Sequence, residues 1–398
     1  MSGRQDEEHG SADRRLTRRD APYDGCPVAH GPDGVWHVRG FAEARAALRS
    51  GDTVQAGLGI ETVQLLPKRV RRPVLYRDGA EHREQRRQTA RYFTPRRVNG
   101  QYRDVAVRIA EAQLAKLRAA GSADLSELAF HLAVEVASVV IGLTDGRPGI
   151  HRRLQSFFPA HIGTPGLTSP RGLYWAARHG VNWLRVYLFD VLPSVRARRR
   201  KGEDDLITHL VGEGCTTAEI LGECLTFAAA GMITTREFIN AAAWHLFTDD
   251  ALRARYRAAD EPERLAVLHE ILRLEPVVNL LRRRTTAPVE LPGATVPAGA
   301  VVDIHLGQIN TDPRAVGADP TGLCPGRPLA HGADGPVLSF GDGAHKCPGA
   351  PIAILEADVF LTRLLALPGV RMTAEPRVSY IDTIGGYELR GLTVSVTP

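Results

Sequence analysis

The residues Phe340–Gly349 read FGDGAHKCPG and place a single cysteine, Cys347, at the end of a glycine-rich loop. His345 lies two residues before this cysteine, and Pro348 directly follows it. Loops of this kind serve several chemistries: phosphate binding, zinc coordination, a nucleophilic thiol, a disulfide, or ligation of haem iron. The residues around the cysteine bear on the choice between them.

Phosphate and zinc fit this loop poorly. A dinucleotide fingerprint requires glycine where Lys346 stands, and a P-loop requires Ser or Thr where Cys347 stands. Zinc needs four ligands, and the local candidates are only His345, Cys347 and Cys324. A nucleophilic thiol stays open, because the start of a following helix favours thiolate over thiol. A buried structural cysteine would explain neither the glycines nor the histidine.

Ligation of haem accounts for the whole loop. The helix start would hold the sulfur as the thiolate that binds iron, and Pro348 suits the first helical position, where a missing N–H costs nothing. The glycines would let the backbone approach a flat macrocycle closely. His345 and nearby arginines can meet the propionate groups of the haem.

The order of residues also resembles a known family. The pattern Phe340-Gly341-x-Gly343-x-His345-x-Cys347-x-Gly349 is similar to the cysteine-ligand loop of the cytochrome P450 superfamily, in its soluble bacterial, actinobacterial-type members. The resemblance covers about residues 30–398. It implies haem b with Cys347 as axial ligand, and contacts to the haem from Phe340, Gly341, Gly349 and His345.

Three further charged residues match the family in its order. Glu270 and Arg273 in EILR resemble the family's Glu-x-x-Arg pair on one helix face. Arg327 in CPGRP resembles the third member of that structural charge triad. Taken alone, the first two would be an ordinary i,i+3 helix pair.

The resemblance also implies three contacts to the haem propionates. His82 and Arg86 lie four residues apart in HREQR, hence on one helix face. Arg283 resembles the third contact, and its neighbours Arg282 and Arg284 are the alternatives for it. Surface charge is the competing interpretation of His82 and Arg86.

The predicted central helix, residues 217–249, is apolar on nearly all sides and carries Gly231 in its middle. The family has Ala-Gly-x-acid-Thr here, and this acid and alcohol support proton delivery to dioxygen. This chain keeps Thr234, but Ile233 replaces the acid. Protons would then come through water, Thr234, Thr235 or the substrate. We expect Glu237 to face away and to pair with Arg236 or solvent.

Pro348 is a second departure from the family. Backbone N–H groups after the ligand ordinarily donate hydrogen bonds to the sulfur in the family, and proline has none to give. The hypothesis is a more electron-rich thiolate and a lower reduction potential.

The leading function is therefore insertion of one oxygen atom from O2 into a small, largely apolar molecule, such as a secondary metabolite. The chain carries no FAD, FMN or iron–sulfur motif, so electrons would come from a separate ferredoxin and its reductase. Lys346 and the arginines of residues 83–97 are candidates for a basic docking patch. One alternative is a haem-thiolate oxidase that couples rings, closes a ring or uses peroxide without inserting oxygen. Another is a haem-based gas or redox sensor.

Several residues are expected to line the substrate pocket because they are small, apolar or able to anchor a polar group. They are Ala229, Ala230, Val278, Asn279, Leu280 and Ile384. Some of them would be plain core if the pocket lies elsewhere.

Composition sets the class of protein. The chain has 398 residues, 43% hydrophobic and 24% charged, with a formal charge of +5. Its basic runs lack interleaved aromatic residues, which disfavours nucleic-acid binding. Five widely spaced cysteines indicate a reducing compartment. Without a signal peptide or a run of about 20 apolar residues, we expect a soluble cytoplasmic protein, and a monomer.

The elements that must position these residues are mainly helical. We expect a polar, disordered segment over residues 1–30 and one cytochrome P450-like domain over 31–398, with a minor β part. Residues 51–74 are predicted to form a long loop that acts as a substrate lid. The predicted helices cover 80–93, 98–119, 124–142, 180–200, 204–213, 217–249, 262–275 and 350–367. The predicted strands fall within 35–38, 289–306, 337–340 and 391–397.

Overall fold

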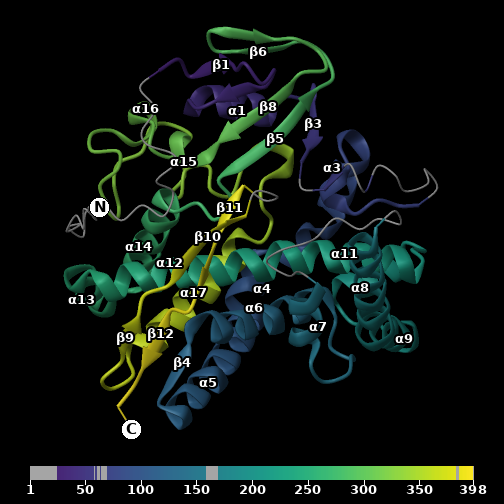
Figure 1. Cartoon of the computed structure of the whole chain (residues 1–398), viewed down its shortest axis with the longest axis vertical. Helices are drawn as coiled ribbons and strands as arrows, with labels where there is room; N and C mark the ends of the chain where they lie inside the picture. Colours follow the sequence, from purple (N-terminus) through teal and green to yellow (C-terminus); the bar gives the residue numbers. More distant parts are fainter. Residues whose placement is uncertain are drawn as a thin grey trace. The chain divides into compact units, whose positions relative to one another are not determined.

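The computed structural model describes residues 25–57, 59–60, 63, 70–157, 169–381 and 385–397. Most of these residues are helical, with short strands, which confirms the predicted fold class (Figure 1). The chain divides into two compact units. Unit 1 comprises Met1–Leu58, Glu237–Cys347 and Leu365–Ser395, and unit 2 comprises Gly59–Arg236, Pro348–Leu364 and Val396–Pro398.

Unit 1 contains most of the strands. The helices are α1 (Phe41–Arg49), α13 (Asp250–Ala258), α14 (Glu261–Leu274), α15 (Leu306–Ile309), α16 (Pro313–Val316) and the 3-10 turn η7 (Gly343–His345). The strands are β1 (Val28–His30), β2 (Trp36–Val38), β3 (Thr53–Ala56), β5 (Leu280–Thr285), β6 (Val289–Leu291), β7 (Ala294–Val296), β8 (Val301–His305), β9 (Arg371–Ala374), β10 (Arg377–Ile381), β11 (Gly386–Arg390) and β12 (Thr393–Ser395).

A five-stranded sheet, in the order β1-β2-β8-β5-β3, organises unit 1. β2 and β8 are parallel, whereas the other neighbours are antiparallel. Apolar side chains of the sheet and of α1 pack together in one core. This core includes Val38 and Ile304 of the sheet and Leu306 of α15. The β10–β11 hairpin forms a separate two-stranded sheet.

Unit 2 is built almost entirely of helices. They are η2 (Val74–Tyr76), α3 (Gly79–Thr89), η3 (Ala90–Phe93), α4 (Pro95–Arg97), η4 (Val98–Tyr102), α5 (Arg103–Ala120), α6 (Leu125–Ile141), α7 (Ile150–Phe157), α8 (Pro170–Val186), η5 (Tyr187–Val191), α9 (Leu192–Arg200), α10 (Leu206–Gly212), α11 (Thr217–Ala228) and η6 (Ala229–Ile233). Strand β4 is Ser122–Asp124. Two helices, α12 (Thr234–Thr248) and α17 (Ala350–Leu365), have residues in both units.

The predicted central helix is present as α11, η6 and α12, which follow one another along one long helical stretch (Figure 1). Its first turn is fixed by a capping box, in which Thr216 and Glu219 each accept a hydrogen bond from the other's backbone N–H. Between α11 and α12 the helix widens into a π-helical turn, Ala229–Ile233, at the position where the sequence predicts a break.

Two local predictions are wrong. Residues 337–340 form turns and no strand, because Val337 has a φ of +54° and the N–H groups of Val337, Ser339 and Gly341 donate to carbonyls three residues back. Donors used in turns are not available to a strand ladder. The helix predicted from residue 180 begins at Pro170, where the Ser169 side chain accepts a hydrogen bond from Gly172 N at 3.0 Å.

Only part of the predicted lid, residues 51–74, lies within the described residues. Its first residues form strand β3, which pairs with β5. Residues 58, 61–62 and 64–69 lie outside the described part of the chain, as do residues 1–24 of the predicted disordered segment. Within the described residues no helix has the length and apolar character needed to cross a membrane.

Candidate functional site

The loop that carries Cys347 is closed on itself. Cys347 N donates a hydrogen bond to Phe340 O at 2.8 Å, which joins the two ends of the loop. Gly341 and Gly343 adopt φ values of +70° and +66°, which favour glycine. A Cβ on Gly343 would also overlap the carbonyl oxygen of Leu48 on α1. The glycines therefore fix the shape of the loop.

Asp342 holds this loop to α1, and the sequence analysis did not single it out. Its carboxylate accepts hydrogen bonds from Arg45 Nε at 3.1 Å, Arg49 Nε at 2.8 Å and Gly343 N at 2.8 Å. Burial alone would raise the pKa of Asp342, but the hydrogen bonds from Arg49, Gly343 and Arg45 hold it below its usual range. Asp342 directly precedes a glycine turn, and aspartate typically caps such turns, so this position in the sequence could have marked it.

The cysteine itself is exposed at the end of the closed loop, and His345 is partly exposed. Within the described ranges no three His, Cys, Asp or Glu side chains come together to hold a metal ion by themselves. An exposed single thiol on a rigid loop fits one axial ligand to a haem iron better than a zinc site. Lys346 is exposed and pairs with Asp334 at 2.9 Å, so its charge is partly balanced.

Glu270, Arg273 and Arg327 are in direct contact within unit 1. Arg273 donates to both carboxylate oxygens of Glu270, at 2.8 and 2.7 Å, and Arg327 Nε donates to Glu270 Oε1 at 2.9 Å. Both arginines also donate to backbone carbonyls, including that of Gly322. Burial opposes ionisation of Glu270, but the hydrogen bonds, led by that from Arg273, lower its pKa. The network joins α14 to the segment that precedes the cysteine loop.

Arg283 differs from its two neighbours. Residues of β5 alternate between faces, so Arg283 is buried whereas Arg282 and Arg284 are exposed. Arg282 pairs with Asp303 at 2.6 Å, and Arg284 donates to Gly299 O. Arg283 Nη1 donates to Gln55 Oε1 at 2.5 Å on β3. Of the three arginines, Arg283 alone lies on the buried face.

His82 and Arg86 lie on α3 in unit 2, one turn apart as predicted. The His82 side chain is buried and that of Arg86 is partly buried. Burial of a histidine on a helix of such polar composition is unusual for a plain surface face.

The π-helical turn contains Gly231 and Ile233, and Thr234 follows it at the start of α12. Thr234 Oγ1 donates a hydrogen bond to Ala230 O at 2.5 Å, so its lone pairs are left as acceptors. A Cβ on Gly231 would meet Ala137 Cβ at 3.9 Å, an ordinary contact, so close helix packing does not require this glycine. Ile233 is half-buried and Thr235 is buried.

Glu237 does not face solvent. Its side chain is fully buried in unit 1, and its two oxygens accept hydrogen bonds from Leu389 N and Arg390 Nη1, each at 2.8 Å. Arg236 instead lies over the Phe130 ring in unit 2. The Glu237 carboxylate is therefore engaged in fixing strand β11.

The expected substrate residues have varied environments. Ala230 is exposed, whereas Ala229, Val278 and Leu280 are partly buried. Asn279 is buried, and its Oδ1 accepts a hydrogen bond from Gly307 N at 2.7 Å. This oxygen is therefore engaged by the backbone of Gly307. Ile384 lies outside the described residues.

Glu223 on α11 is a buried acid that the sequence analysis did not single out. It accepts hydrogen bonds from Gln85 Nε2 at 2.7 Å and Val74 N at 3.1 Å. Burial raises the pKa of Glu223, and the hydrogen bonds from Gln85 and Val74 oppose that shift. An acidic residue inside an apolar helix was the signal. Glu223 ties the end of the predicted lid, at Val74, to the central helix.

Comparisons with known proteins identify the family of this chain. The cytochrome P450 family model matches residues 265–372. The erythromycin C-12 hydroxylase of Saccharopolyspora erythraea is 30% identical over 364 residues, covering 88% of this chain and 85% of the hydroxylase. The nocardicin C N-oxygenase of Nocardia uniformis subsp. tsuyamanensis is 31% identical over 347 residues, covering 84% and 80%. A solved structure of a mutant of P450 EryK in complex with erythromycin B superposes with a TM-score of 0.73 at 27% identity, covering 93% of each chain.

Proposed function

The chain belongs to the cytochrome P450 family, and we propose that it inserts one oxygen atom from O2 into a small, largely apolar secondary metabolite. The family carries haem iron with a cysteine thiolate ligand. The similar proteins are named as a hydroxylase and an oxygenase, so the chain is a monooxygenase-type oxidoreductase rather than a sensor. The observation that carries the proposal is the exposed Cys347 thiol at the end of a closed, clamped loop.

Each part of the chain has a proposed task. Cys347 holds the iron, and a bound haem supplies the centre at which dioxygen is activated. Phe340, Gly341, His345 and Gly349 would lie against the haem. His82, Arg86 and Arg283 would neutralise the propionates, since buried cations are stabilised by such partners.

Thr234 is proposed to help deliver a proton at the site. Because its hydroxyl already donates to Ala230 O, Thr234 Oγ1 can accept a hydrogen bond from a water or a proton-bearing group at the site. Ile233 supplies no proton, and the Glu237 carboxylate is engaged by Leu389 N and Arg390. Protons would therefore arrive through ordered water, Thr235 or the substrate itself.

Electrons are proposed to come from a ferredoxin and its reductase. Arg83 and Arg96 in unit 2 are basic residues without a partner among the described residues, and they are candidates for docking an acidic ferredoxin. The substrate is proposed to resemble secondary metabolites, because the similar proteins carry the names of erythromycin and nocardicin C.

The proposal is tested by reconstituted turnover. Compounds are first screened for a shift of the haem Soret band, and positive compounds are incubated with NADPH, ferredoxin and reductase. NADPH consumption matched by a product one oxygen heavier supports oxygen insertion. Turnover without any oxygenated product would contradict it.

A second function is favoured by the isoleucine at position 233. An oxidase that couples rings, closes a ring or uses peroxide tolerates loss of the family's acid more readily than a monooxygenase. Dehydrogenated or dimeric products, or turnover driven by hydrogen peroxide alone, would favour this function over oxygen insertion.

Replacing Ile233 by glutamate is expected to lower the peroxide released per product by about tenfold, because a positioned acid typically contributes 10²–10⁴-fold to proton transfer. The measurement is the ratio of peroxide to oxygenated product at a fixed rate of NADPH consumption. Ile233→Gln is the matched control, since glutamine has the same shape without an acidic proton. Equal ratios for the two variants would show that proton supply at this position does not limit the reaction.

Replacing Pro348 by leucine is expected to raise the haem reduction potential. The new N–H can donate to the sulfur, and a difference of about 1 kcal/mol between iron states corresponds to roughly 40 mV. The measurement is a spectroelectrochemical titration. Pro351→Leu, three residues further on the exposed face of α17, should leave the potential unchanged. An unchanged or lower potential for Pro348→Leu would contradict the hypothesis of an electron-rich thiolate.

A further inference from the structure

Helix α8 of unit 2 exposes a group of apolar side chains to solvent (Figure 1). Eight large apolar side chains are exposed among the described residues, and six of them lie on α8 and the turn after it: Leu173, Tyr174, Val181, Trp183, Leu184 and Leu188. Large contiguous apolar patches on soluble proteins commonly mark a contact with a partner.

The opposite face of α8 already fixes the helix to unit 2. Asn182 is buried, and its Nδ2 donates a hydrogen bond to Ser156 O on α7 at 2.8 Å. Val186 is buried in the apolar core of the unit. A helix of a globular protein ordinarily buries one apolar face and exposes a polar one. The outward face of α8 is therefore a second apolar face, and it stays exposed.

This outward face has the spacing of a contact between two helices. Tyr174, Ala177, Val181 and Leu184 follow one another in steps of three, four and three residues, and all four are exposed. These are the a and d positions in the seven-residue repeat of a coiled coil, so the four side chains form one stripe along the helix. A second helix that lies along α8 would cover this stripe.

A row of arginines runs along one edge of the stripe. Arg171, Arg178 and Arg185 are seven residues apart, at the positions whose charges select the partner of a coiled coil. No ion pair of these arginines occurs among the described residues. The sequence between Asp145 and Asp190 contains no aspartate or glutamate. This edge of α8 is therefore positively charged and complements an acidic partner.

The other edge of the stripe leaves room for close approach. An apolar hollow of about 280 Å³ lies there, lined by Gly180, Trp183, Leu184, Tyr187 and Leu221. Glycine in the interior of a helix is destabilising relative to alanine. A Cβ on Gly180 would meet no described atom within 4 Å, so packing within the described chain does not require this glycine. The close backbone of a partner helix would account for it.

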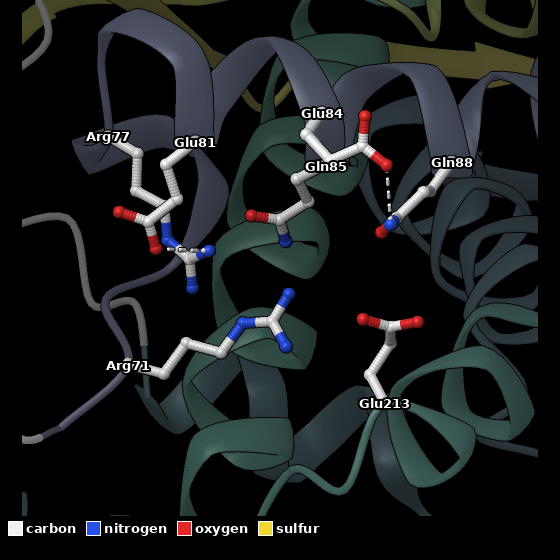
Figure 2. Close-up of a pocket in the computed structure, with 7 residues that line it drawn as sticks. All are labelled: Arg71, Arg77, Glu81, Glu84, Gln85, Gln88 and Glu213. Carbon is white, nitrogen blue, oxygen red and sulfur yellow. Dashed lines mark hydrogen bonds and ion pairs between the residues drawn. The ribbon is translucent and has the colours of Figure 1, made fainter.

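A second hollow in unit 2 has the opposite character (Figure 2). It measures about 310 Å³ and is lined only by polar side chains: Arg71, Arg77, Glu81, Glu84, Gln85, Gln88 and Glu213. Several of its charges are paired within the chain, since Arg77 pairs with Glu81 at 3.0 Å and Glu84 pairs with Arg87 at 2.6 Å. The hollow beside α8 is the one suited to an apolar side chain from a partner.

Two other occupants fit the α8 face less well. A second copy of the chain would bring the same face, and hence a second row of arginines without carboxylates. A flat anionic lipid surface would contact both edges of the stripe, whereas the arginines of α8 line one edge only.

We propose that the outward face of α8 docks an acidic amphipathic helix of another protein. The apolar residues of that helix cover the stripe and fill the hollow beside Gly180. Its Asp or Glu side chains accept hydrogen bonds from Arg171, Arg178 and Arg185. This docking goes beyond the proposed oxygenation and does not depend on it.

Fluorescence anisotropy with the full-length, haem-loaded protein tests this. The probe is a labelled synthetic peptide of about three heptads, with leucine at a and d, glutamate at e and g, and alanine elsewhere. The comparison peptide has lysine in place of every glutamate. The glutamate peptide is expected to bind saturably and at least tenfold more tightly than the lysine peptide. Absence of saturable binding of the glutamate peptide, or equal binding of the two, would overturn the proposal.

Variants of exposed residues locate the contact. Val181→Glu is expected to weaken binding of the glutamate peptide at least tenfold, because it places a carboxylate inside the apolar stripe. Arg178→Glu combined with Arg185→Glu is expected to reverse the preference, so that the lysine peptide binds more tightly. Val378→Glu is the matched control, since Val378 on β10 is also an exposed valine, and it should bind as the unaltered protein does. Unchanged binding in Val181→Glu would contradict the proposal.

The other occupants have their own readouts. Dimerisation of the unaltered protein that Val181→Glu abolishes would assign the face to a second copy and overturn the proposal. Sedimentation with phosphatidylglycerol vesicles that Val181→Glu abolishes would assign it to lipid, with the same consequence. The Soret band and the rate of product formation report separately on the haem, so a failure here is distinct from a failure of the proposed oxygenation.

Discussion

Replacing Cys347 by alanine is expected to abolish the haem-thiolate spectrum and to reduce oxygenation to background. The thiolate is the proposed protein ligand of iron, and its electron donation promotes cleavage of the O–O bond. The loss should exceed the roughly 10–100-fold that removal of an outer partner of a metal site costs. The measurements are the carbon monoxide difference spectrum of the reduced protein and the rate of product formation.

The same variant should fold. Cys347 is exposed, and the hydrogen bond that closes its loop comes from its backbone N–H, which alanine keeps. Cys324→Ala is the matched control, because Cys324 is likewise exposed and its hydrogen bond to Glu270 comes from its backbone N–H, which alanine keeps. A retained thiolate spectrum in Cys347→Ala, or its loss in Cys324→Ala, would show that the ligand has been assigned to the wrong cysteine.

Replacing Glu270 by glutamine is expected to lower the free energy of unfolding by about 3 kcal/mol, because removal of one partner from a buried ion pair leaves an uncompensated charge. The Arg273 side chain is fully buried and donates to both oxygens of Glu270, so its charge has no route to water. The measurement is the urea midpoint at neutral pH.

A control for Glu270 lies on the same helix. Glu263 pairs with Arg255 at 2.9 Å, but both side chains are more than 40% exposed, so Glu263→Gln should cost at most about 1 kcal/mol. An equal loss in free energy of unfolding for the two variants would contradict the claim that burial makes the Glu270 ion pair the stronger of the two.

The effect of Glu270 should also depend on pH. Because its pKa in the folded state lies below its ordinary value of 4.5, the stabilisation is present above that value and is lost as the pH falls through the folded pKa. The difference in free energy of unfolding between the unaltered protein and Glu270→Gln should therefore become smaller at acidic pH. A difference that stays constant below pH 4.5 would contradict this assignment.

The fold could be predicted where a pattern is local. The helices Leu125–Ile141 and Ala350–Leu365 follow apolar spacing that neighbouring residues carry themselves, and Asp124 also caps the first of them. β5 was missed because its sequence, LLRRRT, is dominated by arginines. It is a strand because β3 and β8 pair with it on both sides, and those partners are about 230 and 20 residues away in sequence.

The sequence by itself determined the family, the cysteine proposed to bind iron and the charged pair Glu270–Arg273, because each depends on residues a few positions apart. The tertiary structure decided which groups are already engaged. Three carboxylates accept hydrogen bonds from distant residues. Glu237 accepts from Arg390 and Leu389, Asp342 accepts from two arginines of α1, and Glu223 accepts from Gln85 and Val74. Burial and hydrogen bonding depend on residues far apart in the chain, so a local pattern can mark an acid such as Asp342 or Glu223 as a candidate but cannot show which partners engage it.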